Sequence, residues 1–393
     1  MFGFNDPKTG DFVEVDTTVG GRATKSGERI TAKSAISIPM VWSCVKVLSE
    51  AGGGLPLKAY EDVKGERQLA DLTPRKRRLL ERPGPYLTRL VFLKAVIANM
   101  ALRGNAYAII ERNRQREWIG TTLVCADNVE IETEAGDLLY WVTIDGDRFP
   151  VSPENMLHFK LFSMDGIAGM SPVEHMAETM GLAKAGQSWS ARFMRKGGFT
   201  GGFAVYKQFL TEDQHKQILA RFPDVRQRDA ESIGGMAILQ GGPEIVPAGL
   251  SQKDAQFIES QQFQEEALAG IWGVPLHLAN RASKTSIVGS NVEQQTINFI
   301  TFGLSPYTLA IEDELNAKLF IQDKQFVEFV MEGLLRADSA GRSTYYQAAL
   351  GGSGGSGWMT INEVRRRENY PPLVGDEYDR VTRWEMQKNA QQI

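Results

Sequence analysis

The chain is poor in the residues that build metal centres and disulfide frameworks. Among its 393 residues are two cysteines and four histidines. Cys44 and Cys125 lie far apart, and none of these side chains has a partner at the spacing of metal ligands. We therefore expect no metal site, and we interpret both cysteines as small buried apolar residues in a reducing compartment. We expect structural or solvated roles for the histidines, His158, His175, His215 and His277.

Long apolar runs are also missing. No stretch reaches the roughly 18 apolar residues that a membrane-spanning helix needs. The first residues, MFGFNDPKTG, do not have the basic-then-apolar form of a signal peptide. The net charge of −4 excludes a polycation, so any contact with nucleic acid must be local or weak. We expect a soluble protein without a membrane partner, made and kept inside a cell or packed into something made there.

The sequence has no complete motif for catalysis or nucleotide binding. Residues 20–26 match only the end of a phosphate loop, because they lack the glycine before Lys25. Ser43 and Lys46 have the Ser-x-x-Lys spacing of some acyl-transfer enzymes, but they lie in an ordinary apolar helical pattern. A serine hydrolase using Ser43 and Lys46 is kept as an alternative, and we assign no catalytic residue and no cofactor.

What the sequence does contain is a mixture of helical and strand patterns. Residues 1–33 are polar and without periodicity, which predicts a loose, flexible arm that is disordered or ordered only against a neighbour. Helical spacing of apolar residues predicts helices over 34–52, ended by Gly52 to Gly54, and over 90–102. Alternating patterns predict short strands over 55–60, 106–111, 121–126, 129–133, 138–144 and 156–161. An α+β domain over about 1–165 follows from this order.

Two long helical patterns follow, with a short insert between them. Ser171 as N-cap and Pro172 at the first position start a helix that can run unbroken to residue 196. The second pattern covers 251–273 and ends before Pro275. The insert, 197–250, contains a strand over 203–206, a helix and a strand over 236–240. We predict a small α/β unit at the far end of a two-helix stalk.

A polar loop at 274–290 joins the second stalk helix to another helical pattern. This loop has Arg281 and Lys284, giving it a net charge of +2. The helix over 291–319 includes Pro306, which predicts a kink. One such loop would add little affinity for DNA, but the same loop repeated around a ring would make a collar of positive charge. A solvated surface loop is the alternative. Further on, a strand is predicted over 326–331, and the Gly/Ser tract 351–357 is predicted to be flexible.

Several short segments, in this order and spacing, resemble bacteriophage portal proteins of the HK97 family over nearly the whole chain. They are Val41 to Val45 with Leu55-Pro56-Leu57, Gly104 to Tyr107, His158-Phe159-Lys160 with Gly169 to Val173, Ile271 to Pro275, Asn291 to Gln295, Leu304-Ser305-Pro306 with Ile311 to Asn316, Gly333 to Arg336, and Ile361 to Arg365.

The resemblance implies a ring, usually of twelve copies, at one vertex of the phage head, through which a separate terminase pumps DNA. It implies a portal fold with an α/β wing, a two-helix stem, a small α/β clip, a kinked long helix and a helical C-terminal crown. The corresponding segments are the arm 1–33, wing 34–170, stem helices 171–196 and 251–273, clip 197–250, tunnel loop 274–290, kinked helix with its return to the wing 291–345, and crown 346–393.

The resemblance also implies site residues and partners. The tunnel-loop residues expected to face DNA are Arg281, Ser283, Lys284, Thr285 and Ser286. The clip residues expected to meet partners are Phe203, Arg221, Arg226 and Arg228. The implied partners are further copies of the chain, double-stranded DNA contacted through its backbone, the terminase large subunit, a head-tail adaptor, and the major capsid protein or scaffold. The implied location is the portal vertex of the virion, after assembly in the host cytoplasm. A head-tail adaptor ring is the alternative from the same location.

Overall fold

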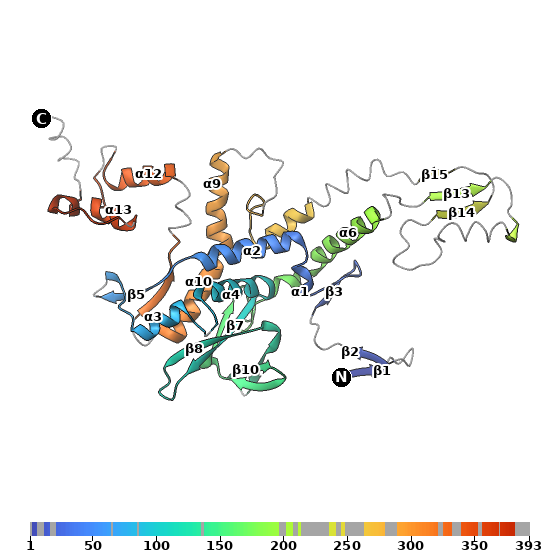
Figure 1. Ribbon diagram of the computed structural model, residues 1–393, viewed down its shortest axis with the longest axis horizontal. Helices are drawn as coiled ribbons and strands as arrows, with labels where there is room; N and C mark the ends of the chain where they lie inside the picture. Colours follow the sequence, from blue (N-terminus) through green and yellow to red (C-terminus); the bar gives the residue numbers. More distant parts are fainter. Residues whose placement is uncertain are drawn as a thin grey trace.

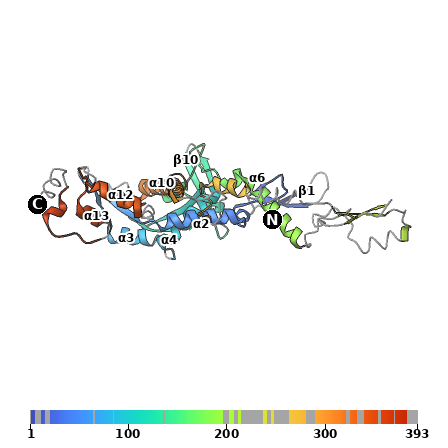
Figure 2. The same cartoon turned by 90° about the horizontal axis from the view of Figure 1, so that it is seen from above.

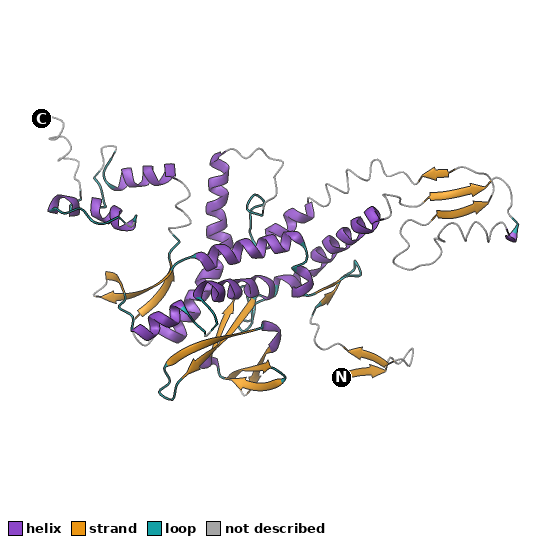
Figure 3. Cartoon of the chain, in the orientation of Figure 1, coloured by secondary structure: helices purple, strands orange, loops and turns teal. Residues whose placement is uncertain are grey.

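The structure is a computed structural model, and it combines helices with mainly antiparallel sheets (Figure 3), which confirms the α+β class. It describes residues 2–5, 12–15, 21–63, 66–84, 86–134, 137–195, 202–206, 211–213, 236–240, 245–247, 263–279, 289–320, 325–331, 339–352, 356–368 and 370–381. Figure 2 shows an elongated molecule.

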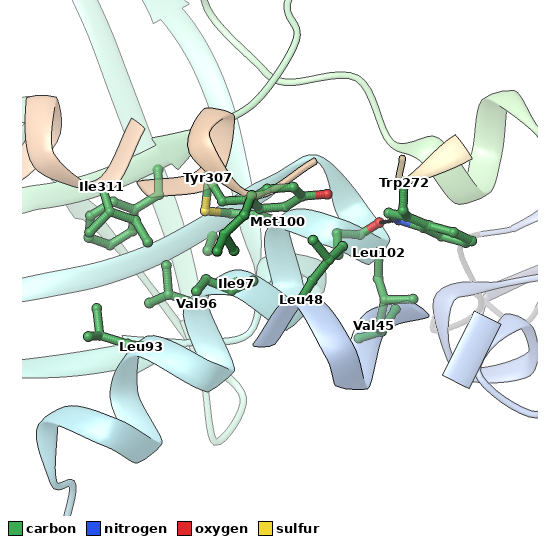
Figure 4. Packing of buried hydrophobic residues seen from close by; sticks show 14 of the residues in the cluster. Val45, Leu48, Leu93, Val96, Ile97, Met100, Leu102, Trp272, Tyr307 and Ile311 are labelled. Atoms are coloured by element: carbon green, nitrogen blue, oxygen red, sulfur yellow. Dashed lines mark hydrogen bonds between the residues drawn. The ribbon is translucent and has the colours of Figure 1, made fainter. Parts of the chain in front are cut away.

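The centre of the molecule is a pair of packed helices, α2 (Pro39–Gly54) and α4 (Arg89–Arg103). Thr88 caps α4 by accepting a hydrogen bond from the Val91 amide, and Gly104 ends it in the left-handed conformation. Figure 4 shows their apolar side chains meeting those of α10 (Ser305–Leu315). Both helices were predicted, so this apolar periodicity does identify the core.

The predicted end of α2 is wrong. The helix continues through Gly54 instead of stopping at Gly52. The glycines are needed for close packing: a Cβ at Gly52 would lie 2.5 Å from Cδ1 of Ile97, and one at Gly53 would lie 2.6 Å from Cγ of Lys94. Their small size lets α2 and α4 approach each other, and it does not break the helix.

Two three-stranded antiparallel sheets lie on one side of this helix pair (Figure 1). The first has the order β12-β7-β8, with β12 (Met156–Lys160), β7 (Asn105–Arg112) and β8 (Trp118–Val124). The second has the order β11-β10-β9, with β11 (Asp147–Val151), β10 (Asp137–Ile144) and β9 (Val129–Glu134). Single-turn helices η1 (Ala126–Asn128) and η2 (Pro153–Asn155) connect them. All strands except β11 were predicted.

A third sheet joins distant parts of the chain. Its order is β16-β5-β6, with β16 (Gln325–Phe329), β5 (Leu57–Val63) and β6 (Glu66–Leu69). Helix α3 (Pro74–Glu81) follows β6. The sequence predicted β5 and β16 but not their pairing. In this sheet β16, which follows the kinked helix in the chain, pairs with β5 of the predicted wing.

Helix α10 holds β16 through two side chains. Glu312 accepts a 2.7 Å hydrogen bond from the Phe329 amide. Asn316 accepts one from the Val327 amide (2.7 Å) and donates one to the Val327 carbonyl (3.0 Å). The two side chains lie four residues apart, hence on one helix face. They satisfy backbone groups at the sheet edge that would otherwise lack partners.

The next face of the same helix holds β12. Glu314 accepts a 2.8 Å hydrogen bond from the His158 amide, and Lys318 donates one of 2.5 Å to the Met156 carbonyl. Lys318 also pairs with Glu314 at 2.5 Å, four residues away. One helix therefore fixes two sheets by their backbones.

The predicted kink in the long helix is confirmed. Helix α9 (Gly289–Asn298) passes through a π-helical turn, η3 (Phe299–Leu304), before α10, and η4 (Asn316–Phe320) is a second π turn. Proline at position 306 removes one helical donor. The Ile300 carbonyl accepts from both the amide and the hydroxyl of Ser305, the hydroxyl at 2.8 Å. As Figure 1 shows, α9 stands away from the layer formed by α2 and α4.

The first stem helix is interrupted where we predicted none. Helix α5 (Pro172–His175) is separated from α6 (Ala177–Arg195) by Met176, at φ −102° and ψ 20°. A helix covers residues 263–271, the described part of the second stem pattern. The clip segment contains β13 (Gly202–Tyr206), β14 (Met236–Gln240) and β15 (Ile245–Pro247), in the order β14-β13-β15, with β13 and β14 parallel.

The prediction of an arm without regular structure is wrong for several N-terminal segments. Strands β1 (Phe2–Asn5) and β2 (Phe12–Val15) form a hairpin, as do β3 (Arg22–Ala23) and β4 (Arg29–Ile30). Thr31 and Ser34 then form a capping box at α1 (Ala32–Ala35). Ile30 is fully buried in the main core, so this part of the arm belongs to the wing.

The C-terminal segment contains α12 (Ser339–Ala349), α13 (Ile361–Arg367) and η6 (Asp376–Asp379). The glycine tract does not behave as a free linker at its described positions. Gly351 ends α12 at φ 86°, and the Gly352 amide donates to the Gln347 carbonyl at 2.6 Å. The Trp358 amide returns to the Ala349 carbonyl at 2.9 Å. The tract thus reverses the chain around the end of α12.

Candidate functional site

The predicted tunnel loop starts from a firmly anchored helix end. The Trp272 indole donates a 2.8 Å hydrogen bond to the Ala101 carbonyl at the end of α4, as the dashed line in Figure 4 shows. Gly273, at φ 62°, donates to the Gly270 carbonyl, and Val274 donates to the Ala269 carbonyl. This pair of bonds is a Schellman motif. The motif needs a residue that adopts a positive φ without strain, as glycine does. The helix end is therefore fixed by both its backbone and its side chains.

The first loop residues remain attached to the core. Val274 and Ala279 are buried in the main apolar cluster. The Leu278 and Ala279 amides bond the Pro275 carbonyl, which closes a turn. The chain is thus part of the core as far as Ala279.

The chain returns to the same place through α9 and η3. Gly303 lies against Gly273, and a Cβ on Gly303 would be 3.0 Å from the Gly273 oxygen. Phe299 and Ile300 are buried in the core beside it. The described residues on either side of the predicted loop, 273–279 and 299–304, are therefore both held by one structural unit. This is the geometry of a loop carried on a fixed base.

A cavity of about 460 Å³ lies in the angle between the two anchors. Residues 273–277 line one side of it, and Gln295, Asn298, Phe299 and Phe302 line the other. Phe302 is 76% exposed. Both ring nitrogens of His277 are buried, and neither has a hydrogen-bond partner among the described residues. The residue as a whole is half-buried, and the sequence did not predict the burial of its ring nitrogens.

The predicted DNA-facing residues, Arg281, Ser283, Lys284, Thr285 and Ser286, lie outside the described residues. So do Arg221, Arg226 and Arg228 of the clip. Phe203 lies on β13, opposite Ala237 of β14 and Val246 of β15. The described structure therefore fixes where the loop begins and ends, and the roles of these side chains stay predictions.

A buried polar network, not predicted from sequence, ties the wing sheet to the start of the stem. Asn105 donates to the Gly169 carbonyl (2.7 Å), and its oxygen accepts from the Gly169 amide (2.7 Å). This fixes the amide orientation, so His158 Nε2 donates to Asn105 Oδ1 (2.9 Å) and Nδ1 accepts from the Tyr140 hydroxyl (3.1 Å). Tyr107 stacks on the imidazole.

The network keeps His158 neutral. Burial, and to a smaller extent the nearby charges of Lys160 and Lys318, together lower the pKa of His158 to about 3. The imidazole therefore acts as a hydrogen-bonding strut at physiological pH, with Nε2 protonated. Only the His-Phe-Lys segment marked this position in the sequence, because its partners lie 18 and 53 residues away.

The described residues provide no support for a hydrolase or metal site. Ser43 is half-buried and Lys46 is exposed on α2, and in the described structure no hydrogen bond joins their side chains. Across the described ranges, no three His, Cys, Asp or Glu side chains come together to hold a metal ion. None of the helices described there is long and apolar enough to cross a bilayer.

The two cysteines differ in their surroundings. Cys44 is buried in the core, as predicted, and burial raises the pKa of its thiol to about 12. The prediction that Cys125 is buried is wrong, because it follows the end of β8 and is exposed there. Its thiol donates to the Asp127 carboxylate at 3.8 Å.

Comparison with known proteins links this geometry to one family. The family model for phage portal protein matches residues 39–369. The portal protein of Enterobacteria phage HK97 is 30% identical over 361 residues, which cover 90% of this chain and 82% of that protein.

Two solved structures share the fold. The neck of an empty gene transfer agent particle, with C6 symmetry, aligns with a TM-score of 0.63 at 20% identity, covering 90% of this chain and 97% of that one. The neck of a native particle, with C12 symmetry, aligns with a TM-score of 0.59 at 19% identity, covering 87% and 94%. At this identity the likeness shows the arrangement of elements, and it confirms the fold class predicted above.

Proposed function

This chain belongs to the phage portal protein family, and from that premise we propose that twelve copies form a ring at one vertex of a phage head. Double-stranded DNA enters the head through the channel of this ring and later leaves through it. The C6 and C12 symmetry of the necks that share its fold supports a ring. The role is structural, with no catalytic group or cofactor supplied by this chain.

The observation that carries the proposal is that the described residues before and after the predicted loop are anchored together. Trp272 bonds the Ala101 carbonyl, and Gly273 lies against Gly303 of η3. A fixed base lets each copy present its loop at the same height around an axis. Under the proposal, the residues that face the DNA backbone are Arg281, Ser283, Lys284, Thr285 and Ser286.

The remaining partners follow from the same arrangement. The clip, with Phe203, Arg221, Arg226 and Arg228, meets the terminase large subunit during packaging and the head-tail adaptor afterwards. The wing meets the major capsid protein or scaffold. Assembly takes place in the host cytoplasm, and the ring stays in the virion.

A packaging assay on particles with Arg281→Ala/Lys284→Ala tests the proposed loop. We expect changed packaging rate or DNA retention, with a salt dependence that differs from wild type, because two cations per copy are removed from the DNA path. Lys25→Ala/Lys33→Ala, which removes two exposed wing lysines, is the matched control. Normal rate and retention of the loop variant at every salt concentration would overturn the proposed role of the loop.

A further inference from the structure

Two basic segments that are separate in sequence lie together on the wing surface. The first is residues 75–82 in and after α3, and the second is residues 111–117 at the turn between β7 and β8. The Arg75 guanidinium pairs with the Glu117 carboxylate. At the other end of α3, the Thr121 amide donates to the Pro83 carbonyl at 2.7 Å. These two contacts hold α3 along β8, and we name the two segments together the basic patch.

The basic patch concentrates positive charge on a chain of net charge −4. It has three carboxylates, Glu81, Glu111 and Glu117, and a net charge of +5. Its eight cations are Arg75, Lys76, Arg77, Arg78, Arg82, Arg112, Arg114 and Arg116. Seven of the eight are arginines, whose planar forks suit bidentate binding of phosphate. Gathering like charges raises the local potential and attracts a polyanion.

Only part of this charge is used by the fold. The arginines with partners are Arg75 with Glu117, Arg77 with Asp71 (3.4 Å) and Arg112 with Asn155 (3.1 Å). Four others are exposed, and within the described part of the chain none has a carboxylate partner: Arg78, Arg82, Arg114 and Arg116. These four side chains are available to a ligand.

The placement of the patch arginines suits an extended anion. Arg75 and Arg78 lie at i and i+3, hence on one side of α3, and Arg82 follows at its C-cap. The ion pair of Arg75 places that side next to the 111–117 turn. Leu79 is buried, so the patch lacks the apolar centre of a protein-protein interface. If an acidic protein bound here, it would need an exposed apolar side chain to pack against. Ile119, which is 47% exposed at the margin of the basic patch, could serve as that contact.

We propose that the basic patch is a second binding site for the phosphate backbone of double-stranded DNA, separate from the tunnel loop. This proposal rests on the proposed function in one respect, because it requires that DNA comes close to the ring. The chemistry is non-specific: guanidinium groups bind phosphate oxygens and release counterions, with no base contact.

Binding of a short fluorescein-labelled duplex to the purified full-length protein, followed by anisotropy over a series of salt concentrations, tests this site. The variant combines Arg78→Gln, Arg82→Gln, Arg114→Gln and Arg116→Asn. Asparagine is used at 116 because that residue has φ 62°. We expect weaker binding and a log-log salt slope shallower by about 0.9 for each phosphate that the variant no longer binds.

The matched control removes four exposed lysines elsewhere on the wing, with Lys25→Gln, Lys33→Gln, Lys46→Gln and Lys58→Gln. Circular dichroism establishes that both proteins are folded. Weaker binding by the patch variant alone supports the site. Equal binding by both variants overturns it, as does a patch variant that binds DNA normally but fails to bind an acidic capsid protein. Neither result bears on ring formation or on the Arg281→Ala/Lys284→Ala assay, so failure of the two proposals is distinguishable.

Discussion

His158 illustrates how much one side chain can organise in this protein. Its imidazole bonds Asn105 and Tyr140, and its backbone amide bonds Glu314 of α10. Asn105 in turn bonds both backbone groups of Gly169, where the chain approaches the stem. The wing sheet, the kinked helix and the entrance to the stem therefore meet at one neutral imidazole.

This neutrality predicts a pH dependence of stability. The ordinary pKa of histidine is 6.5, whereas that of folded His158 is about 3. Below pH 6.5 the unfolded chain binds a proton that the folded chain does not, so stability is fully present above that pH and is lost as pH falls. The free energy of unfolding should drop by about 1.4 kcal/mol per pH unit below roughly pH 6.

Denaturant unfolding of the wild type and of His158→Gln, from about pH 7 to about pH 5, measures this contribution. Glutamine has a donor and an acceptor but does not titrate, so its slope should be smaller. His175→Gln removes an exposed histidine and should keep the wild-type slope. The same slope in wild type and His158→Gln would show that His158 is not the cause.

At the scale of single residues, the sequence predicted the roles of side chains better than it predicted their contacts. A structural role was expected for His158, but its bonds to Asn105, Tyr140 and Glu314 span 18 to 156 residues and follow no spacing rule. His277 was expected to be structural or solvated, and its two ring nitrogens are buried without a hydrogen-bond partner among the described residues. Hydrogen bonds of this kind depend on the tertiary fold, which periodicity does not describe.

At the scale of elements, the helix that ends at Gly273 decides where the loop begins. Two nearby glycines differ in whether they tolerate a side chain. Gly270 lies inside the helix, and a Cβ there would have nothing within 4 Å among the described residues. Gly273 has φ 62° and lies against Gly303. The first glycine is replaceable, and the second one forms the turn.

We therefore expect opposite effects from the same substitution at the two positions. Gly270→Ala should stabilise the protein by about 0.5–1 kcal/mol, since alanine favours helix over glycine. Gly273→Ala should destabilise it by about 1 kcal/mol, because alanine is strained at positive φ. Thermal unfolding of both variants measures the difference. Stabilisation by Gly273→Ala would mean that the helix does not end in this turn.

Elements were predictable where the apolar pattern was local. Helices α2 and α4 and the strands β7 to β10 follow their periodicities. Strand β11 was missed because it contains Pro150, which sits at a sheet edge. Helix α3 was missed because five of its eight residues are charged and Leu79 is its one buried side chain. The pairing of β16 with β5 joins segments more than 250 residues apart, so no local pattern predicts it.

On the scale of the whole molecule, the proposed roles of the loop and the basic patch require many copies of the chain in one assembly. A closed ring uses heterologous interfaces, in which each copy binds the next by two different surfaces. In such a ring a weak phosphate contact is repeated by every subunit, so affinity builds up without a tight site in any one chain. Apart from the family resemblance, no feature of the sequence indicates this assembly, because a single chain does not encode its symmetry in any local pattern.

Single-particle electron microscopy of the purified full-length protein tests the central claim most directly. The account predicts rings with an axial hole, in which residues 274–290 of every subunit point toward the axis and form the narrowest part of the channel. Single globular particles, or rings in which these residues lie on the outer surface, would contradict it.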